Sequence, residues 1–183
     1  MTLLSETWLA PSANHPPPTP LPARWSRYAP RVKALFLATD AALQNINAPR
    51  ERIACVVAGA DGCHDENRAY FADYLAGGRK LGRAALFIHT LPTAPVAECA
   101  LHFRLRGPLL YALPEDGNLD DALALAEACL AQNDVDIILL LAQTTDRTGC
   151  LALTGPGLSS PASTFPKAGL ESPGPVGKLL HAP

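Results

Sequence analysis

Two long apolar runs dominate the hydrophobic pattern of the chain. Residues Ile53–Gly59 and Val135–Ala142 show no continuous polar face, and Asp136 is the one polar interruption of the second run. Strands that are apolar along their whole length are typical of a parallel sheet covered by helices on both faces. Shorter apolar segments at Leu109–Leu113 and Cys150–Leu153 predict two further strands.

Apolar residues at three- and four-residue spacing predict helices between these strands. The first helix begins at Pro30, which suits a first helical position, and the stretch Asn45–Pro49 ends it. The strongest helical pattern covers Leu119–Gln132. Two more helices are predicted over residues 65–76 and 94–104, an extended segment over 84–87, and a loop over 89–92.

Helices that alternate with strands define an α/β class, with a mostly parallel central sheet covered by helices. The length predicts a single domain over residues 1–183. Residues 11–23 are too rich in proline for helix or sheet and predict an extended arm. Residues 155–183 are rich in glycine, proline and serine, and they predict a mostly irregular tail.

Charge and composition exclude several kinds of partner. The net charge is −2, and the sequence has no basic stripe, so neither nucleic acid nor an anionic membrane is an expected partner. No run reaches the roughly 18 apolar residues of a membrane-spanning helix. Residues 1–10 have no basic residue ahead of a hydrophobic stretch, unlike a secretory signal. We therefore expect a cytoplasmic protein.

The five cysteines are scattered and include no CxxC pair, which predicts reduced thiols in place of a disulfide framework. Cys55, Cys99 and Cys129 fall within apolar patterns, where a free cysteine packs as a small hydrophobic residue. Cys63 stands beside His64, but adjacent residues rarely converge on one substrate atom. We expect neither a metal nor a cofactor.

Several segments occur together in an order and spacing that match a known enzyme family. They are Arg27–Leu35, Arg52–Gly59, Phe87–Pro95 with Ala97-Glu98, and Leu105–Pro108. Together they resemble the N-terminal half of the ketosynthases of the thiolase superfamily. The best match is with the β-ketoacyl synthase-like N-terminal proteins that accompany aryl-polyene and type II fatty-acid gene sets. The resemblance covers about residues 25–145 and implies a thiolase-like half fold.

The resemblance places Asp116 where a ketosynthase carries its nucleophilic cysteine. Gly107-Pro108 before it and Asp121–Leu123 after it keep the family's register, and Glu115 precedes it. A helix N-terminus acidifies a thiol, whereas it makes a carboxylate less basic and less nucleophilic. An acylated aspartate would also be a mixed anhydride, which stores an acyl chain poorly. The alternative role of Asp116 is that of a helix N-cap. The family's second half supplies two catalytic histidines, but the one histidine after residue 146 is His181.

The resemblance also implies a substrate pocket and a dimer interface. In that superfamily the strand before the nucleophile helix pairs across the dimer, and the loop before Gly-Pro reaches toward the pocket of the other subunit. The alternative for His89, which belongs to this loop, is that its ring forms a hydrogen bond with the backbone and does not line a pocket. The candidate substrate-binding residues are Phe87, His89, Thr90 and Pro92, and the candidate interface residues are Leu109, Leu110, Tyr111 and Leu113.

Three functions are compatible with these features. The first is a non-catalytic partner of an intact ketosynthase and acyl carrier protein, in a homo- or heterodimer, for type II fatty-acid, polyketide or aryl-polyene synthesis. Known partners of this kind keep both halves of the fold, whereas this sequence keeps little more than one. The second is residual decarboxylation or hydrolysis of a thioester, with Asp116 or Glu115 as base and His89 nearby. The third is a small module that binds an acyl chain or carrier without chemistry. We expect no condensing activity from the chain alone.

Overall fold

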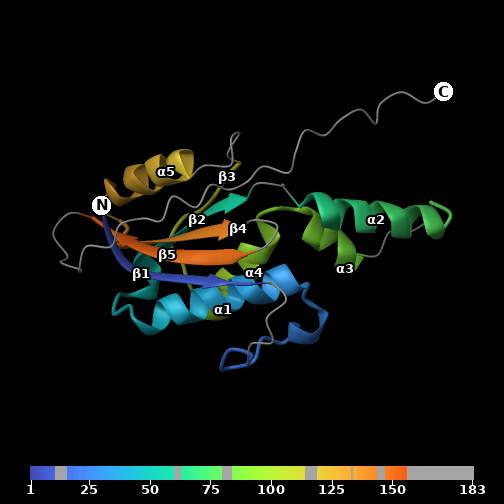
Figure 1. Cartoon of the computed structure of the whole chain (residues 1–183), viewed down its shortest axis with the longest axis horizontal. Helices are drawn as coiled ribbons and strands as arrows, with labels where there is room; N and C mark the ends of the chain where they lie inside the picture. Colours follow the sequence, from blue (N-terminus) through green and yellow to red (C-terminus); the bar gives the residue numbers. More distant parts are fainter. Residues whose placement is uncertain are drawn as a thin grey trace.

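A mixed sheet forms the centre of the protein (Figure 1). The computed structural model describes residues 1–10, 16–59, 63–79, 84–113, 119–132, 134–143 and 147–155. The strands are β1 (Thr2–Leu9), β2 (Ile53–Gly59), β3 (Leu109–Ala112), β4 (Ile137–Gln143) and β5 (Thr148–Thr154), in the spatial order β1-β5-β4-β2-β3. Strand β2 is parallel to β3 and β4, while β5 is antiparallel to β4 and β1. Four strands therefore run in one direction against β5, which confirms the predicted α/β class and mostly parallel sheet.

Helices cover both faces of this sheet. Helices α1 (Pro30–Gln44) and α4 (Ala94–Phe103) lie on one face, and α5 (Asp120–Leu130) lies on the other (Figure 1). Every residue of β2 and β4 is buried. Alternate residues of β2 enter different cores, with Val57 on the α1 side and Val56 on the α5 side. The prediction of two strands buried on both faces is confirmed.

Helix α1 packs closely against the sheet. Pro30 occupies its first turn, as predicted. Leu35 and Phe36 have no exposed surface, and burial of a side chain of this size stabilises the fold by about 1.5–3 kcal/mol. Ala38 and Ala42 are also fully buried, and their small side chains let the helix backbone approach β5 and β1.

An ion pair explains the polar interruption of the second apolar run. Arg52 donates from Nε and Nη2 to the two carboxylate oxygens of Asp136, at 2.6 Å each. The backbone N–H of Asp136 donates to the carbonyl of Arg52 at 2.9 Å. This bidentate contact fastens the residue before β4 to the residue before β2. The hydrogen bonds from Arg52, aided by its positive charge, hold the pKa of Asp136 below its usual range.

Gly107 permits a direct backbone contact where β3 begins beside β2. Its N–H donates to the carbonyl of Ile53 at 3.2 Å, and a Cβ at this position would lie 2.4 Å from that carbonyl oxygen. The next residue, Pro108, accepts a hydrogen bond from Cys55 N–H at 2.8 Å. The Gly-Pro pair of the sequence therefore marks a place where two backbones touch and no side chain fits.

Three local differences from the predicted elements are clear. The sequence pattern does not predict β1, which pairs with β5 and contains a register shift between Leu3 and Ser5. The extended segment predicted over residues 84–87 is wrong, because this run of good helix formers adopts helix α3 (Ala84–Phe87). A short 3₁₀ helix, η3 (Ile88–Thr90), forms part of the predicted 89–92 loop.

The remaining predicted helix is α2 (His64–Ala76), which extends beyond the carboxyl end of β2 beside α3 (Figure 1). Residues 11–15 of the predicted arm and 156–183 of the predicted tail lie outside the described residues. Among the helices of the described ranges, none has the length and hydrophobicity that a bilayer crossing requires.

Candidate functional site

The carboxyl ends of β2, β3 and β4 meet at one edge of the sheet. Open α/β sheets commonly place their ligands beside this edge. Residues 114–118, which follow β3 here and include Glu115 and Asp116, lie outside the described residues. The nucleophile position therefore stays a prediction, and the site is built from the neighbouring side chains.

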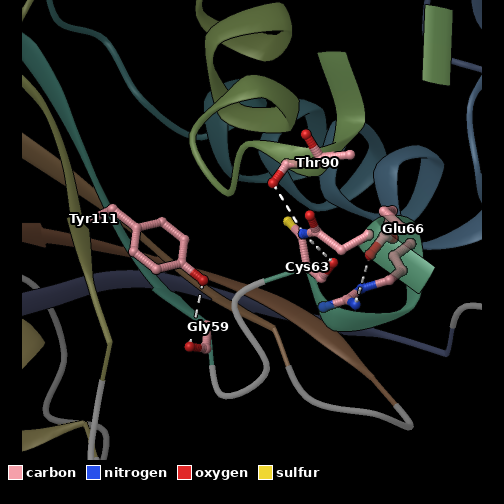
Figure 2. Close-up of polar contacts among 7 residues, drawn as sticks. Gly59, Cys63, Glu66, Thr90 and Tyr111 are labelled. Atoms are coloured by element: carbon pink, nitrogen blue, oxygen red, sulfur yellow. Dashed lines mark hydrogen bonds and ion pairs between the residues drawn. The ribbon is translucent and has the colours of Figure 1, made fainter. Parts of the chain in front are cut away.

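Tyr111 reaches from β3 to the end of β2 (Figure 2). Its hydroxyl donates a long hydrogen bond, 3.4 Å, to the carbonyl of Gly59. A Cβ at Gly59 would lie 2.1 Å from that hydroxyl oxygen. The glycine at the end of β2 is therefore needed for side-chain packing, because the phenol ring occupies the space that a larger residue would fill.

Polar contacts attach the first turn of α2 to its surroundings (Figure 2). Asn67 donates from Nδ2 to the carbonyls of Cys63 at 2.8 Å and Thr90 at 3.1 Å. Cys63 is buried and has a left-handed backbone conformation, with φ 65° and ψ 37°. Glu66 pairs with Arg31 of α1 at 3.7 Å. None of the residues of α2 is fully buried, so these polar contacts and its packing against α3 and η3 hold the helix in place.

The four predicted substrate-binding residues share one short segment but have different surroundings. Phe87 is exposed, and its ring packs against Tyr70 with centroids 5.7 Å apart. The hydroxyl of Thr90 donates to the carbonyl of Phe87 at 2.7 Å, so it closes its own turn. Pro92 is half-buried. The buried Nδ1 of His89 has no hydrogen-bond partner among the described residues, so this atom does not make the backbone hydrogen bond considered as an alternative.

Four cysteines are unsuited to nucleophilic chemistry. Burial raises the pKa of Cys55 to about 12, and it also raises the pKa values of Cys99, Cys129 and Cys150. These thiols stay protonated at neutral pH, and the thiolate is the reactive form. The core positions predicted for Cys55, Cys99 and Cys129 are confirmed. Within the described ranges, no group of three His, Cys, Asp or Glu side chains could hold a metal ion.

Strand β3 forms one edge of the sheet, next to β2. Leu109 and Tyr111 pack toward the α1–α4 core, while Leu110 and Ala112 pack toward the α5 core. All four residues are half-buried, and Leu113 after them is 61% exposed. In the part of the chain that the structure describes, no strand pairs with the outer side of β3. An open edge of this kind can pair with another chain.

A second polar cluster lies between the segment before α1 and helix α4. Tyr28 donates its phenolic O–H to Oε2 of Glu98 at 2.6 Å, and Arg24 donates from Nη1 to Oε1 at 3.2 Å. Burial and the hydrogen bond to Glu98 raise the pKa of Tyr28. Sequence reasoning did not find this cluster, because Tyr28 and Glu98 are 70 residues apart and no local pattern connects them.

The described elements form a three-layer α/β unit, with two helices on one face of the sheet and one on the other. Among solved structures, the fold matches a chain of "Ketosynthase (ApeO) in Complex with its Chain Length Factor (ApeC) from Xenorhabdus doucetiae". The TM-score is 0.58 and the sequence identity is 16%, over 82% of this chain and 68% of that chain. The protein therefore has the ketosynthase-like, thiolase-type fold that the sequence resemblance implied. No family model and no curated protein sequence matches the chain.

Proposed function

We propose that this protein is a non-catalytic partner subunit of a ketosynthase, of the kind called a chain length factor. The observation that carries the proposal is the size of the matched chain. The alignment covers 82% of this chain and 68% of that one, so the matched chain is only about a fifth longer. A subunit of a complex between a ketosynthase and a chain length factor can therefore be similar in length to this chain, which supports the proposal.

The chemistry of the described residues supports a non-catalytic role. The thiols of Cys55, Cys99 and Cys150 are buried and held protonated, so they cannot replace the family's nucleophile. The sequence register puts Asp116 at the position of that nucleophile. A carboxylate cannot store an acyl chain as a thioester, which disfavours condensation at this position and supports a role in shaping or contacting an acyl chain held by another subunit.

The open edge of β3 supports association with another subunit. Exposed apolar side chains occur after this strand and on the segment that precedes α4: Leu113 is 61% exposed, while Phe87 and Leu91 are each 51% exposed. An unpaired strand edge and exposed apolar side chains each favour burial against a second protein. The partner that the fold favours is an intact ketosynthase, and a second copy of this chain is the alternative.

Proline substitution at Leu109 tests edge pairing. Cys55 N–H donates to the carbonyl of Pro108, and by the alternation of a parallel ladder the N–H of Leu109 points to the outer side of β3. Leu109→Pro removes this outward donor without breaking a bond to β2, and proline is tolerated at such edge positions. Leu109→Ala is the matched control, because it shortens the side chain and keeps the donor.

Co-purification with a co-expressed intact ketosynthase, and light scattering of the protein alone, measure association. We expect the wild type and Leu109→Ala to associate and Leu109→Pro to fail. Equal behaviour of the two variants would contradict edge pairing. A ketosynthase assay with acyl and malonyl carrier thioesters then tests the role: the protein should consume neither thioester alone and should change the product when the ketosynthase is present. Consumption by the protein alone would favour the decarboxylase or hydrolase alternative.

A further inference from the structure

We propose that a recess between residues 22–28 and helix α4 binds a small organic carboxylate with an apolar tail. The recess has a volume of about 370 Å³, within the range of small-molecule sites. It lies at the second polar cluster and no residue of β3 lines it, so the inference does not depend on edge pairing or on the proposed function. The side chains that line it and carry the inference are Pro22, Arg24, Tyr28, Glu98, Leu101 and His102.

Arg24 supplies a positioned cation. Its Nη1 donates to Glu98 at 3.2 Å, and Tyr28 holds the other oxygen of the same carboxylate at 2.6 Å. Burial keeps Tyr28 in its neutral, donating form. The guanidinium is thus fixed at one end, while its remaining N–H groups have no partner among the described residues and its side chain is 58% exposed. A planar guanidinium with free N–H groups suits the two oxygens of a carboxylate.

His102 supplies an unpaired polar atom at the same recess. It lies one helical turn after Glu98 on α4, and its ring packs against Phe36 and Phe103 with centroids 5.6 and 4.7 Å away. Its Nε2 is buried and has no hydrogen-bond partner among the described residues. Buried polar atoms without a partner are rare, because desolvation is then uncompensated. A ligand oxygen in the recess would give Nε2 the partner that it lacks.

The walls of the recess select the ligand class. Leu101 is 78% exposed and stands on the rim, and Pro22 lines the other side, so a short hydrocarbon tail finds apolar surface there. The carboxylate of Glu98 belongs to the wall and repels a doubly charged phosphate more strongly than a singly charged carboxylate. Arg24 disfavours an amine. A monocarboxylate with a few methylene groups meets all three conditions.

Titration of the full-length protein with sodium hexanoate tests the proposal, with the amide and indole ¹⁵N–¹H shifts as the measured signal. Trp25 is the local reporter, because its ring lies 6.5 Å from that of Tyr28. We expect saturable shifts at Trp25 and along α4. Arg24→Gln should weaken binding by about tenfold or more, since it removes a charge-assisted contact. Leu101→Asp should abolish binding, because a carboxylate replaces the apolar rim.

Two matched controls complete the test. Arg27→Gln removes an exposed arginine of the same segment, and Leu21→Asp removes a leucine that is 60% exposed, both outside the lining of the recess. Both controls should bind hexanoate like the wild type. The proposal is overturned if hexanoate causes no saturable shift, or if Arg24→Gln and Leu101→Asp bind like their controls. If hexanol binds as tightly as hexanoate, the negative charge of the ligand does not contribute to binding and the proposal is overturned. Tighter binding of hexyl phosphate would refute the carboxylate assignment. Leu101 is exposed, so Leu101→Asp should fold normally. This variant therefore still tests the proposal if Arg24→Gln fails to fold.

Discussion

Replacement of Gly107 by alanine tests the backbone contact that starts β3. The new Cβ would lie 2.4 Å from the carbonyl oxygen of Ile53, 2.6 Å from its carbonyl carbon and 2.9 Å from the nitrogen of Ala54. All three atoms belong to the backbone of a buried strand, so no side-chain rotation relieves the overlap. Overpacking typically costs about 1–3 kcal/mol. We expect the upper end, about 3 kcal/mol, which corresponds to a fall in Tm of about 6–12 °C for a chain of this length.

Urea unfolding measures this loss as a lower midpoint at an unchanged m-value. Gly155→Ala is the matched control, because a Cβ at Gly155 would have no atom within 4 Å. This control should change the free energy of unfolding by less than about 0.5 kcal/mol. If Gly107→Ala is as stable as Gly155→Ala, then β3 can move away from β2 without a loss in the free energy of unfolding. That result would refute the argument that the Gly-Pro pair is required for a tight strand contact.

Three further perturbations have defined outcomes. Asp136→Asn should lower Tm at neutral pH: because Arg52 lowers the pKa of Asp136, the ion pair stabilises the protein above about pH 4 and is lost as the pH falls through the lowered pKa. The difference in Tm between this variant and the wild type should therefore shrink at acid pH. A constant difference between pH 7 and pH 2 would contradict this. Gly149→Ala would place a Cβ 2.4 Å from the ring of Trp8 and should destabilise by about 1–3 kcal/mol with a shifted tryptophan emission, whereas an unchanged spectrum would contradict the contact. Cys99 is fully buried and should react with iodoacetamide only after unfolding, so labelling of the native protein would refute its place in the core.

The sheet centre was predictable because its strands have an unusual composition. A strand covered by helices on both faces has no polar side, and the runs that became β2 and β4 show this directly. Strand β1 (Thr2–Leu9) shows no such signal, because it is a half-buried edge strand and its register shift breaks the two-residue alternation. Helix α3 (Ala84–Phe87) is too short for a helical period to appear in the sequence.

The candidate site was less predictable than the fold. The resemblance pointed to the Gly-Pro pair, but the physical reason for Gly107 is a contact with Ile53 that no local pattern shows. The contact of Tyr28 with Glu98 likewise depends on how α4 packs, and residue spacing along the chain does not encode it. The assignment of Asp116 to the nucleophile position depends on the resemblance alone, and it stays a prediction.

Helix α2 (His64–Ala76) buries none of its side chains, and this has a consequence for its local unfolding. Opening of the helix exposes neither core, so its local unfolding needs far less free energy than unfolding of the sheet. Its amide hydrogens should therefore exchange with solvent well before those of β4, and equal protection of the two would contradict this. On the evolutionary scale, the outer residues of α2 can be replaced with little effect on folding. Substitutions in β4, by contrast, should disturb core packing, because every residue of that strand is buried.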